Sequence, residues 1–289
     1  MNTGIVLLGG KGLRISPQSK FVNKHMNMIY DKPVFFYSIT ALILSGIDKL
    51  IISCNNIDRD IFYNYSKYLC SLGLLTKVVI QSKSGGIPTA IEVCKKEIEE
   101  GSEITVILGD NLIFGNDLFL NIKNTKKNNK SMCFLKKVPD PENFGIAKIN
   151  SNGKILNFVE KPKYTNSRDR AVIGFYKFPF SVFNVIDKLK PSRRGETEIV
   201  DVLQYYKKIH KLNYVEFGRG VYWSDMGSYN SILDASNFIK NMQLNSDQII
   251  GLPEEALIRL KKISKKQLKL IKKFYSNNKS YMNYLNSLY

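Results

Sequence analysis

The stretch that decides the fold is IVLLGGKGLRISP, residues 5–17. Four apolar residues run directly into a cluster of glycines, which is followed by Arg14 and Pro17. A strand that ends in glycine-rich backbone can bring peptide N–H groups close to an anion, and a nearby guanidinium would neutralise phosphate oxygens. An ordinary turn between a strand and a loop is the alternative. No G-K-[ST] follows and a third fingerprint glycine is missing, which excludes a Walker loop and a dinucleotide fingerprint.

The composition indicates a globular protein with reduced thiols. The 289 residues, 44% of them hydrophobic, could form one large domain or two small ones. Four widely spaced cysteines without a C-x-x-C pair, and only two histidines, argue against a zinc site or a disulfide framework. The apolar segment 35–46 is too short to span a membrane, and no basic n-region marks a signal peptide. We expect a cytoplasmic protein without a membrane partner.

The net charge of +18 is compatible with binding to nucleic acid, anionic lipid or phosphorylated substrates. The lysines are scattered, however, and those near the C-terminus alternate in a helical period with Leu260, Ile263, Leu268 and Ile271. A solvated basic surface is therefore the first interpretation, and a surface for polyanions is the second. Because no basic motif is interleaved with aromatic residues, we expect no nucleic-acid partner.

Strand-like and helix-like segments alternate over the first 130 residues. This alternation predicts right-handed crossovers and an α/β fold: a Rossmann-like, mostly parallel mixed sheet flanked by helices. The expected strands are 4–8, 49–54, 77–81 and 103–111, and the expected helices are 33–46, 58–73 and 87–101.

Beyond residue 130 the pattern changes to strands with little helix between them. The runs 131–138, 144–150, 154–161 and 171–178 predict a smaller antiparallel sheet at one edge of the first, with a hairpin turn at Asn152-Gly153. Helices are expected from residue 228 onward. We therefore expect an α/β core over residues 1–240, in which residues 131–225 form a distinct part, and a C-terminal helical segment over residues 241–289.

Ligands of open parallel sheets bind beyond the carboxyl ends of the strands. The segments 9–14, 81–86 and 109–111 fall there. Asp110 could cap a following helix, or it could bind Mg²⁺, which takes one or two carboxylates together with phosphate oxygens. Asp225 is a second carboxylate, and it lies among Trp, Ser and Gly. A charged side chain in these surroundings calls for a functional explanation.

Six ordered motifs make the chain similar to the sugar-1-phosphate nucleotidyltransferase family, with its thymidylyltransferase branch nearest. They are LLGGKGLRISP…NKHMNMIYDKP, LGDNLIFG, FGIAKI, FVEKP, RRGETEIVDV and GRGVYWSDMG, and the segment GLPEEALIRLKKIS resembles the family's C-terminal helical part. The resemblance implies Mg²⁺-dependent attack of a sugar 1-phosphate, glucose 1-phosphate first, on the α-phosphate of dTTP or UTP. Pyrophosphate leaves, and the activated sugar would be used in the synthesis of surface polysaccharide.

The resemblance also implies a role for single residues. Four basic residues would hold the reacting phosphates as catalytic groups: Arg14, Lys24, Lys161 and Arg194. The nucleotide would lie against Leu8, Gly9, Gly10, Gly12, Gln81, Gly86 and Asp110. The sugar would lie in the part formed by residues 131–225, against Gly145, Glu160, Val172 and Trp223. Asp110 and Asp225 would bind Mg²⁺.

Several alternatives stay open. Gln81 could be a plain polar cap, Trp223 a core residue, and Glu160-Lys161 an exposed ion pair of almost no energetic value. Leu8, Leu13, Thr89 and Met226 depart from the family's pattern and could change the choice of nucleotide, at about 1–3 kcal/mol for an unpaired polar partner. CTP or another phosphorylated substrate is the enzymatic alternative. A non-catalytic regulatory protein that binds nucleotide sugars is another, but it would not need both Asp110 and Asp225.

The family resemblance further implies a homo-oligomer, either a tetramer or a dimer. A second nucleotide site near the subunit contact would involve Gly115, the turn at residues 218–220 and the segment 253–258.

Overall fold

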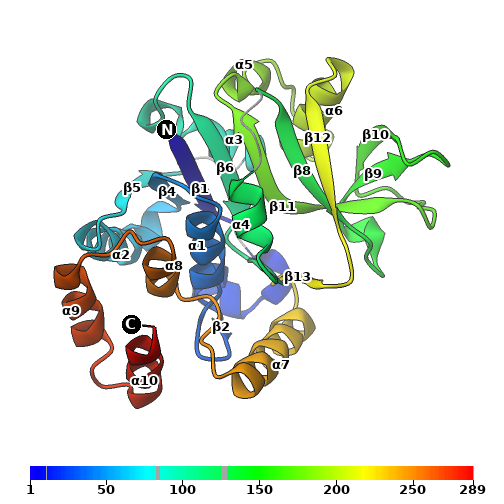
Figure 1. The fold of residues 1–289 in the computed structure, drawn as a ribbon. Coiled ribbons are helices and arrows are strands. Elements are labelled where there is room, and N and C mark those ends of the chain that lie inside the picture. The colour runs from blue at the N-terminus through cyan, green and yellow to red at the C-terminus, as the bar shows by residue number, and fades with distance from the viewer. Residues whose placement is uncertain (11, 83–84, 125–128, 289) are drawn as a thin grey trace.

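The computed structural model describes residues 1–10, 12–82, 85–124 and 129–288, and Figure 1 shows a central twisted sheet with helices on both faces. Within the described residues this sheet has nine strands. Its main path runs β10-β9-β11-β6-β1-β4-β5, and β8 and β12 are attached through β11.

The N-terminal half of the sheet is parallel, as predicted. Its strands are β1 (Asn2–Leu8), β4 (Lys49–Cys54), β5 (Leu75–Ile80) and β6 (Glu103–Leu108). β1 lies between β4 and β6, and all seven of its residues are buried. The glycines that follow β1 and β6 therefore emerge at the same edge of the sheet.

Helices cover both faces of this sheet. They are α1 (Val34–Leu44), α2 (Arg59–Ser71), α3 (Ile87–Glu92), α4 (Leu118–Lys123), α5 (Val182–Ile186) and α6 (Ile199–Lys208). The helix expected over residues 87–101 is shorter than predicted: α3 ends at Glu92, and a 3₁₀ turn occupies Lys95–Glu97. After this turn Ile98 has extended backbone and is buried in the core.

The strands after residue 130 continue the central sheet in antiparallel fashion. They are β8 (Ser131–Lys136), β9 (Gly145–Ile149), β10 (Ile155–Glu160) and β11 (Arg170–Pro179). β11 pairs with β6 of the parallel half as well as with β8 and β9. β12 (Leu212–Phe217) pairs in parallel with β8. The predicted hairpin between β9 and β10 is confirmed, with Gly153 at φ +74 in its turn.

Two small antiparallel pairs lie outside the main sheet. β7 (Asn111–Gly115) pairs with β13 (Val221–Asp225), so that segments more than a hundred residues apart meet directly after β6. β2 (Met28–Ile29) pairs with β3 (Lys32–Pro33) ahead of α1.

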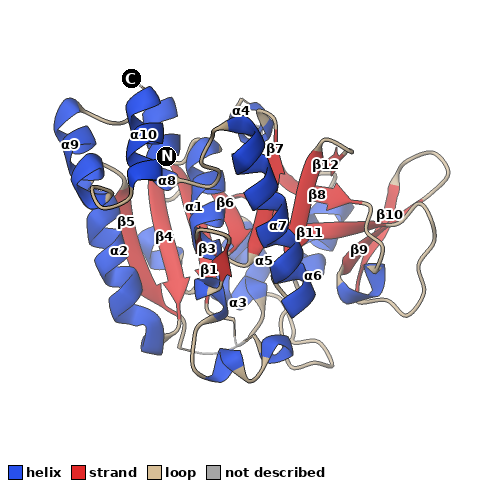
Figure 2. Cartoon of the chain, turned by 90° about the horizontal axis from the view of Figure 1, so that it is seen from below, coloured by secondary structure: helices blue, strands red, loops and turns tan. Residues whose placement is uncertain are grey.

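Four helices end the chain: α7 (Tyr229–Ser246), α8 (Pro253–Arg259), α9 (Lys265–Phe274) and α10 (Lys279–Ser287). A capping box between Ser228 and Ser231 starts α7, which passes unbroken through residue 240. Leu257, Ile271 and Leu285 belong to the same buried cluster as residues of α1 and α2, so the last helices dock on the core (Figure 2). No helix in the described part of the chain has the length and apolarity of a membrane span.

Candidate active site

A cleft of about 560 Å³ opens at the carboxyl ends of β1 and β6, where the fold places ligands. This volume lies within the usual range for small-molecule sites. Its lining includes ten of the residues singled out from the sequence: Gly9, Gly10, Gly12, Arg14, Lys24, Gln81, Gly86, Asp110, Lys161 and Arg194. Lys11 and residues 83–84 of the predicted segments lie outside the described residues, as does the side chain of Leu13.

The glycines after β1 allow other side chains to approach the backbone closely. A Cβ on Gly9 would stand 2.2 Å from Oε1 of Gln81, and one on Gly10 would stand 2.8 Å from Cε of Lys24. Gly12 has φ +60, in the left-handed region that favours glycine. An ordinary turn does not require these approaches. The loop is instead shaped to bring Gln81 and Lys24 against exposed peptide groups.

Lys24 pairs with Asp110 at the centre of the cleft. Lys24 begins a 3₁₀ turn, Lys24–Met26, in which Asn23 accepts a hydrogen bond from the backbone N–H of His25. Its Nζ donates to Oδ2 of Asp110, and the amide of Asn111 donates to the other oxygen at 3.0 Å. Burial alone would raise the pKa of Asp110, but the charge of Lys24 and these hydrogen bonds hold that pKa well below its ordinary value. Asp110 is therefore ionised.

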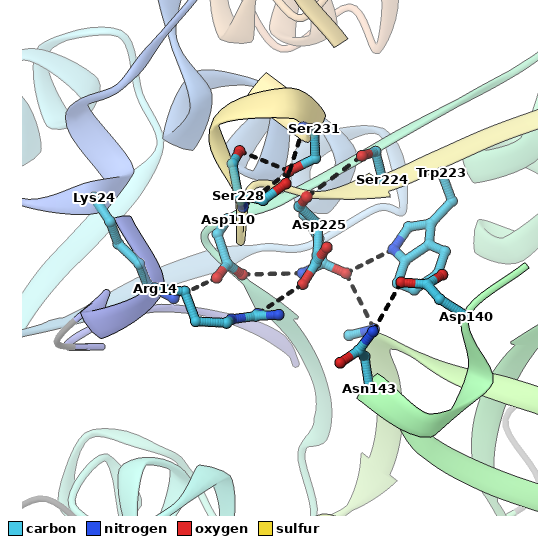
Figure 3. Close-up of polar contacts among 12 residues, drawn as sticks. Arg14, Lys24, Asp110, Asp140, Asn143, Trp223, Ser224, Asp225, Ser228 and Ser231 are labelled. Atoms are coloured by element: carbon cyan, nitrogen blue, oxygen red, sulfur yellow. Dashed lines mark hydrogen bonds and ion pairs between the residues drawn. The ribbon is translucent and has the colours of Figure 1, made fainter. Parts of the chain in front are cut away.

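The β7–β13 pair places Asp225 beside Asp110. Asp225 lies opposite Asn111 in the ladder, and the N–H of Met226 donates to the carbonyl of Asp110 at 2.8 Å. Arg14 lies 3.1 Å from the Asp225 carboxylate, and both aspartates face the same space (Figure 3). Burial and the charge of Asp110 raise the pKa of Asp225 despite Arg14. Two carboxylates share this space, and they repel each other.

Arg194 lies in a ring of carboxylates at the other wall of the cleft. Its guanidinium lies 3.2 Å from Glu160 and 3.5 Å from each of Glu196 and Glu198. Burial and the charge of Glu198 raise the pKa of Glu160. In the described structure the ion-pair partner of Glu160 is thus Arg194, and not the adjacent Lys161, which has φ +42 and donates its N–H to Phe144.

Six of the predicted site residues are not in the cleft lining: Leu8, Gly145, Glu160, Val172, Trp223 and Asp225. Leu8 is fully buried and Val172 is 6% exposed, so both side chains lie in the core. Trp223 donates from Nε1 to the side-chain Oδ1 of Asn111 at 2.8 Å, and its ring lies 5.1 Å from that of Phe144. Gly145 lies next to Glu160, with a Cβ position 3.1 Å from its carboxylate. A sugar contact of the four residues named for it stays a prediction, as do the nucleotide contact of Leu8 and the Mg²⁺ contact of Asp225.

Asn111 belongs to the candidate site, although the sequence did not single it out. It is 2% exposed, donates to Asp110, and accepts from Trp223 and from the N–H of Gly174 at 3.2 Å. It therefore fixes the orientation of the Asp110 carboxylate. Its place directly after Asp110, as a polar residue that begins an apolar strand, was the available signal.

Thr89 and Thr197 join the two walls of the cleft. Both hydroxyls donate to the carbonyl of Gly85, at 2.9 and 2.7 Å, and they lie 3.0 Å from each other. The N–H of Thr197 donates to the same carbonyl at 2.8 Å. Thr89 had been noted only as a departure from the family's pattern, and the structure gives it a partner more than a hundred positions away.

The protein can supply two carboxylates to a cation, because Asp110 and Asp225 face one space. Among the described residues no three His, Cys, Asp or Glu side chains meet in a metal-binding group. His25 is 2% exposed, and burial and Lys24 lower its pKa to about 3, so its imidazole is neutral. Any further ligands of such a cation would come from a bound substrate or from solvent.

Comparisons with known proteins agree with this geometry. The family model described as nucleotidyl transferase matches residues 3–242. Glucose-1-phosphate thymidylyltransferase from Mycolicibacterium smegmatis is 30% identical over 92% of this chain and 91% of its own length. The enzyme of the same name from Mycobacterium tuberculosis (strain CDC 1551 / Oshkosh) is 29% identical over 95% of this chain and 96% of its own.

Solved structures show the same fold. A Bacillus anthracis structure assigned as a glucose-1-phosphate thymidylyltransferase, in complex with sucrose, superposes with a TM-score of 0.74 at 31% identity, covering 82% of this chain and 95% of the other. A UDP-glucose pyrophosphorylase complexed with UDP-glucose gives a TM-score of 0.72 at 22% identity, covering 84% and 99%. The chain belongs to the nucleotidyl transferase family, and its relatives are nucleotidyltransferase enzymes.

Proposed function

We propose that the protein joins dTTP or UTP to a sugar 1-phosphate, with glucose 1-phosphate the first candidate, to give a nucleotide sugar and pyrophosphate. The observation that carries this proposal is the pairing of two neighbouring aspartates with two cations that line the cleft, Lys24 with Asp110 and Arg14 with Asp225. Relatives named for thymidylyl transfer to glucose 1-phosphate support the choice of substrates.

The paired charges suit an exchange when a triphosphate binds. The phosphate oxygens would compete with Asp110 and Asp225 for Lys24 and Arg14. The Arg14 side chain is 62% exposed, so it is free to turn toward an incoming phosphate. Both carboxylates would then have lost their cations in a partly buried space, which is costly unless another cation replaces them.

The two carboxylates fit Mg²⁺. This ion takes hard oxygen ligands and is usually held by one or two carboxylates together with substrate phosphates. Burial and the charge of Asp110 both raise the pKa of Asp225, and a cation between the two carboxylates would offset their repulsion. When bound, Mg²⁺ would neutralise charge that develops on the phosphate oxygens.

The rest of the reaction would depend on how the basic side chains position the two substrates. The sugar phosphate oxygen attacks the α-phosphorus in line, a new P–O bond forms, the bond to the bridging oxygen breaks, and pyrophosphate leaves. Arg14 and Lys24 would hold the triphosphate, and Lys161 and Arg194 would hold the sugar phosphate. Orienting two anions that repel each other supplies much of the rate enhancement in such transfers. On binding, the sugar phosphate would replace the glutamates as the ion-pair partner of Arg194.

The choice of base would depend on Gln81 and Gly86. Gln81 lies against Gly9, where its amide can reach a base seated on the glycine loop. An amide offers one acceptor and two donors, which match the edge of a pyrimidine. Because the Leu8 side chain is buried under the loop, its departure from the family's pattern would act through the position of the loop and not through direct contact with the base.

We also propose a cytoplasmic homo-oligomer, as a dimer or a tetramer. Leu233 and Leu244, which are 60% and 67% exposed on α7, are large apolar side chains that a subunit contact would cover. Light scattering during gel filtration tests this: an oligomer is expected, and a monomer at every concentration would overturn it.

Product identification tests the proposed activity. The protein is incubated with Mg²⁺ and glucose 1-phosphate together with dTTP, UTP or CTP, and the products are identified by mass spectrometry. A dTDP- or UDP-sugar is expected. A nucleotide sugar formed only from CTP, or only with another sugar phosphate, would overturn the substrate assignment. No product with any pair would overturn the catalytic function and favour a binding protein.

A further inference from the structure

The C-terminal part of the chain carries positive charge out of proportion to its length. Residues 256–289 contain nine of the 43 Lys and Arg residues and none of the 25 Asp and Glu residues. Half of the net charge of +18 therefore resides in this last eighth of the chain. The proposed reaction uses none of these residues, so their charge is unexplained by the active site.

The lysines of helix α9 lie on one side of the helix. Ile271 is buried against the core, and Gln267 and Leu268 beside it are half-buried. With 3.6 residues per turn, the opposite side of the helix carries five lysines. They are Lys265, Lys266, Lys269, Lys272 and Lys273, of which all but the half-buried Lys272 are exposed. We call these five residues, together with Leu270 and Phe274, the α9 face.

The lysines of the α9 face lack acidic partners among the described residues. The neighbouring Lys262, by contrast, lies 3.9 Å from Asp48 and donates to the carbonyl of Ile47. The side chains of Leu270 and Phe274 are 38% and 57% exposed and lie along the margin of the lysines. One surface thus combines unpaired cations with exposed apolar groups.

We propose that the α9 face binds an anionic lipid bilayer. Each lysine near an anionic membrane surface strengthens binding about fivefold, and clusters of four to eight on an amphipathic helix are typical of lipid-binding surfaces. Leu270 and Phe274 would enter the interface between headgroups and acyl chains. An array of nucleic-acid phosphates would neutralise the lysines but gives the aliphatic Leu270 no apolar environment, which favours lipid over nucleic acid.

The place of α9 in the fold suits this contact. Figures 1 and 2 both place α9 on the outer side of α2, whereas β9 and β10 lie at the opposite end of the molecule. The absence of a spanning segment led us to expect no membrane partner, but a peripheral contact of a folded helix needs no span. The inference does not depend on the proposed function, because no residue of the cleft takes part.

Vesicle sedimentation tests the inference with the full-length protein. Binding is expected to vesicles that contain phosphatidylglycerol, to weaken steeply with salt, and to be absent with phosphatidylcholine alone. The triple variant Lys265→Gln, Lys269→Gln, Lys273→Gln should bind about a hundredfold more weakly. Lys154→Gln, Lys188→Gln, Lys190→Gln removes the same charge from exposed positions elsewhere and should bind like the wild type.

The variant Leu270→Asn distinguishes binding to a lipid bilayer from binding to other polyanions. It should weaken vesicle binding and leave binding to duplex DNA unchanged. Absence of vesicle binding by the wild type would overturn the proposal, as would equal losses in the two triple variants. Tighter binding to DNA than to vesicles, lost in the α9 variant, would assign the surface to nucleic acid instead.

Discussion

Arg14 and Asp225 are separated by 211 positions in the chain, and their side chains lie 3.1 Å apart beside the cleft that Arg14 lines. The contact joins the loop after the first strand to the end of β13, next to the equivalent pair of Lys24 and Asp110. A Cβ on Gly227 would stand 2.3 Å from the Arg14 guanidinium, so the chain after Asp225 is shaped to admit this side chain. The charges of the cleft are thus built by tertiary structure.

Asp110→Asn should lower turnover by about a hundredfold or more, because the variant loses the charge that a cation in the cleft requires. Steady-state kinetics at several Mg²⁺ concentrations measure the loss, and circular dichroism checks that the fold is intact. Asp117→Asn is the matched control, since Asp117 is exposed and Asn tolerates its left-handed backbone at φ +49. Wild-type turnover of Asp110→Asn would remove the metal role.

Gly9→Ala should weaken triphosphate binding at least tenfold, because the added Cβ would stand 2.2 Å from Oε1 of Gln81 and push that side chain out of place. Calorimetric titration with dTTP measures the affinity. Gly101→Asn is the control, since a Cβ there meets nothing within 4 Å and Asn tolerates its left-handed backbone at φ +79. An unchanged affinity in the Gly9 variant would contradict the assignment of the glycine loop.

Thr89→Val should raise the KM for the sugar 1-phosphate several-fold and lower the free energy of unfolding by about 1–2 kcal/mol. The variant loses the hydrogen bonds to Gly85 and Thr197 that join the two cleft walls. Thr89→Ser should restore the KM. Thr40→Val removes a comparable hydroxyl bonded to Phe36 and should change stability alone. A KM unaffected in Thr89→Val would limit Thr89 to a structural role.

Glu254 should make the protein less stable as the pH rises above about 4.5. Its side chain is fully buried, and burial raises its pKa above the ordinary 4.5, although Tyr68, Tyr275 and Lys32 act in the opposite direction. Between the unfolded and the folded pKa the folded chain holds the extra proton, so the free energy of unfolding falls as the pH increases, by at most about 1.4 kcal/mol per pH unit.

Urea unfolding of Glu254→Gln at a series of pH values checks this sign. The slope of unfolding free energy against pH should be less negative than in the wild type over that window. Glu100→Gln, at an exposed position, should keep the wild-type slope. Identical slopes in wild type and Glu254→Gln would mean that Glu254 is ionised in the folded chain throughout.

Local patterns in the sequence predicted the parallel half of the sheet and its ligand edge, because alternating strands and helices permit few topologies. The quoted motifs contain Arg14, Lys24, Asp110 and Arg194, and Gln81 ends a strand predicted to reach the ligand edge. The structure brings all five to one cleft. Such local patterns could not predict contacts between side chains that are distant in the sequence. Periodicity does not show that β11 joins the antiparallel strands to β6, or that Thr89 meets Thr197.

Two of the predicted contact residues show a second limit. Val172, predicted for the sugar, and Leu8, predicted for the nucleotide, were placed by the family resemblance, and the structure puts both side chains in the core. A motif position conveys which backbone lies near a site, but the side chain's direction depends on packing. For the same reason Asn111, which orients Asp110 and accepts from Trp223, was overlooked beside its charged neighbour.

The most direct test of nucleotidyl transfer follows the phosphorus atoms. The protein is given glucose 1-phosphate, Mg²⁺ and dTTP labelled in either the α- or the γ-phosphate, and products are separated by chromatography. The account predicts α-label in the nucleotide sugar and γ-label in pyrophosphate, with both signals lost in Asp110→Asn. Retention of both labels in unreacted dTTP, or appearance of γ-label in inorganic phosphate or in the sugar, would contradict it.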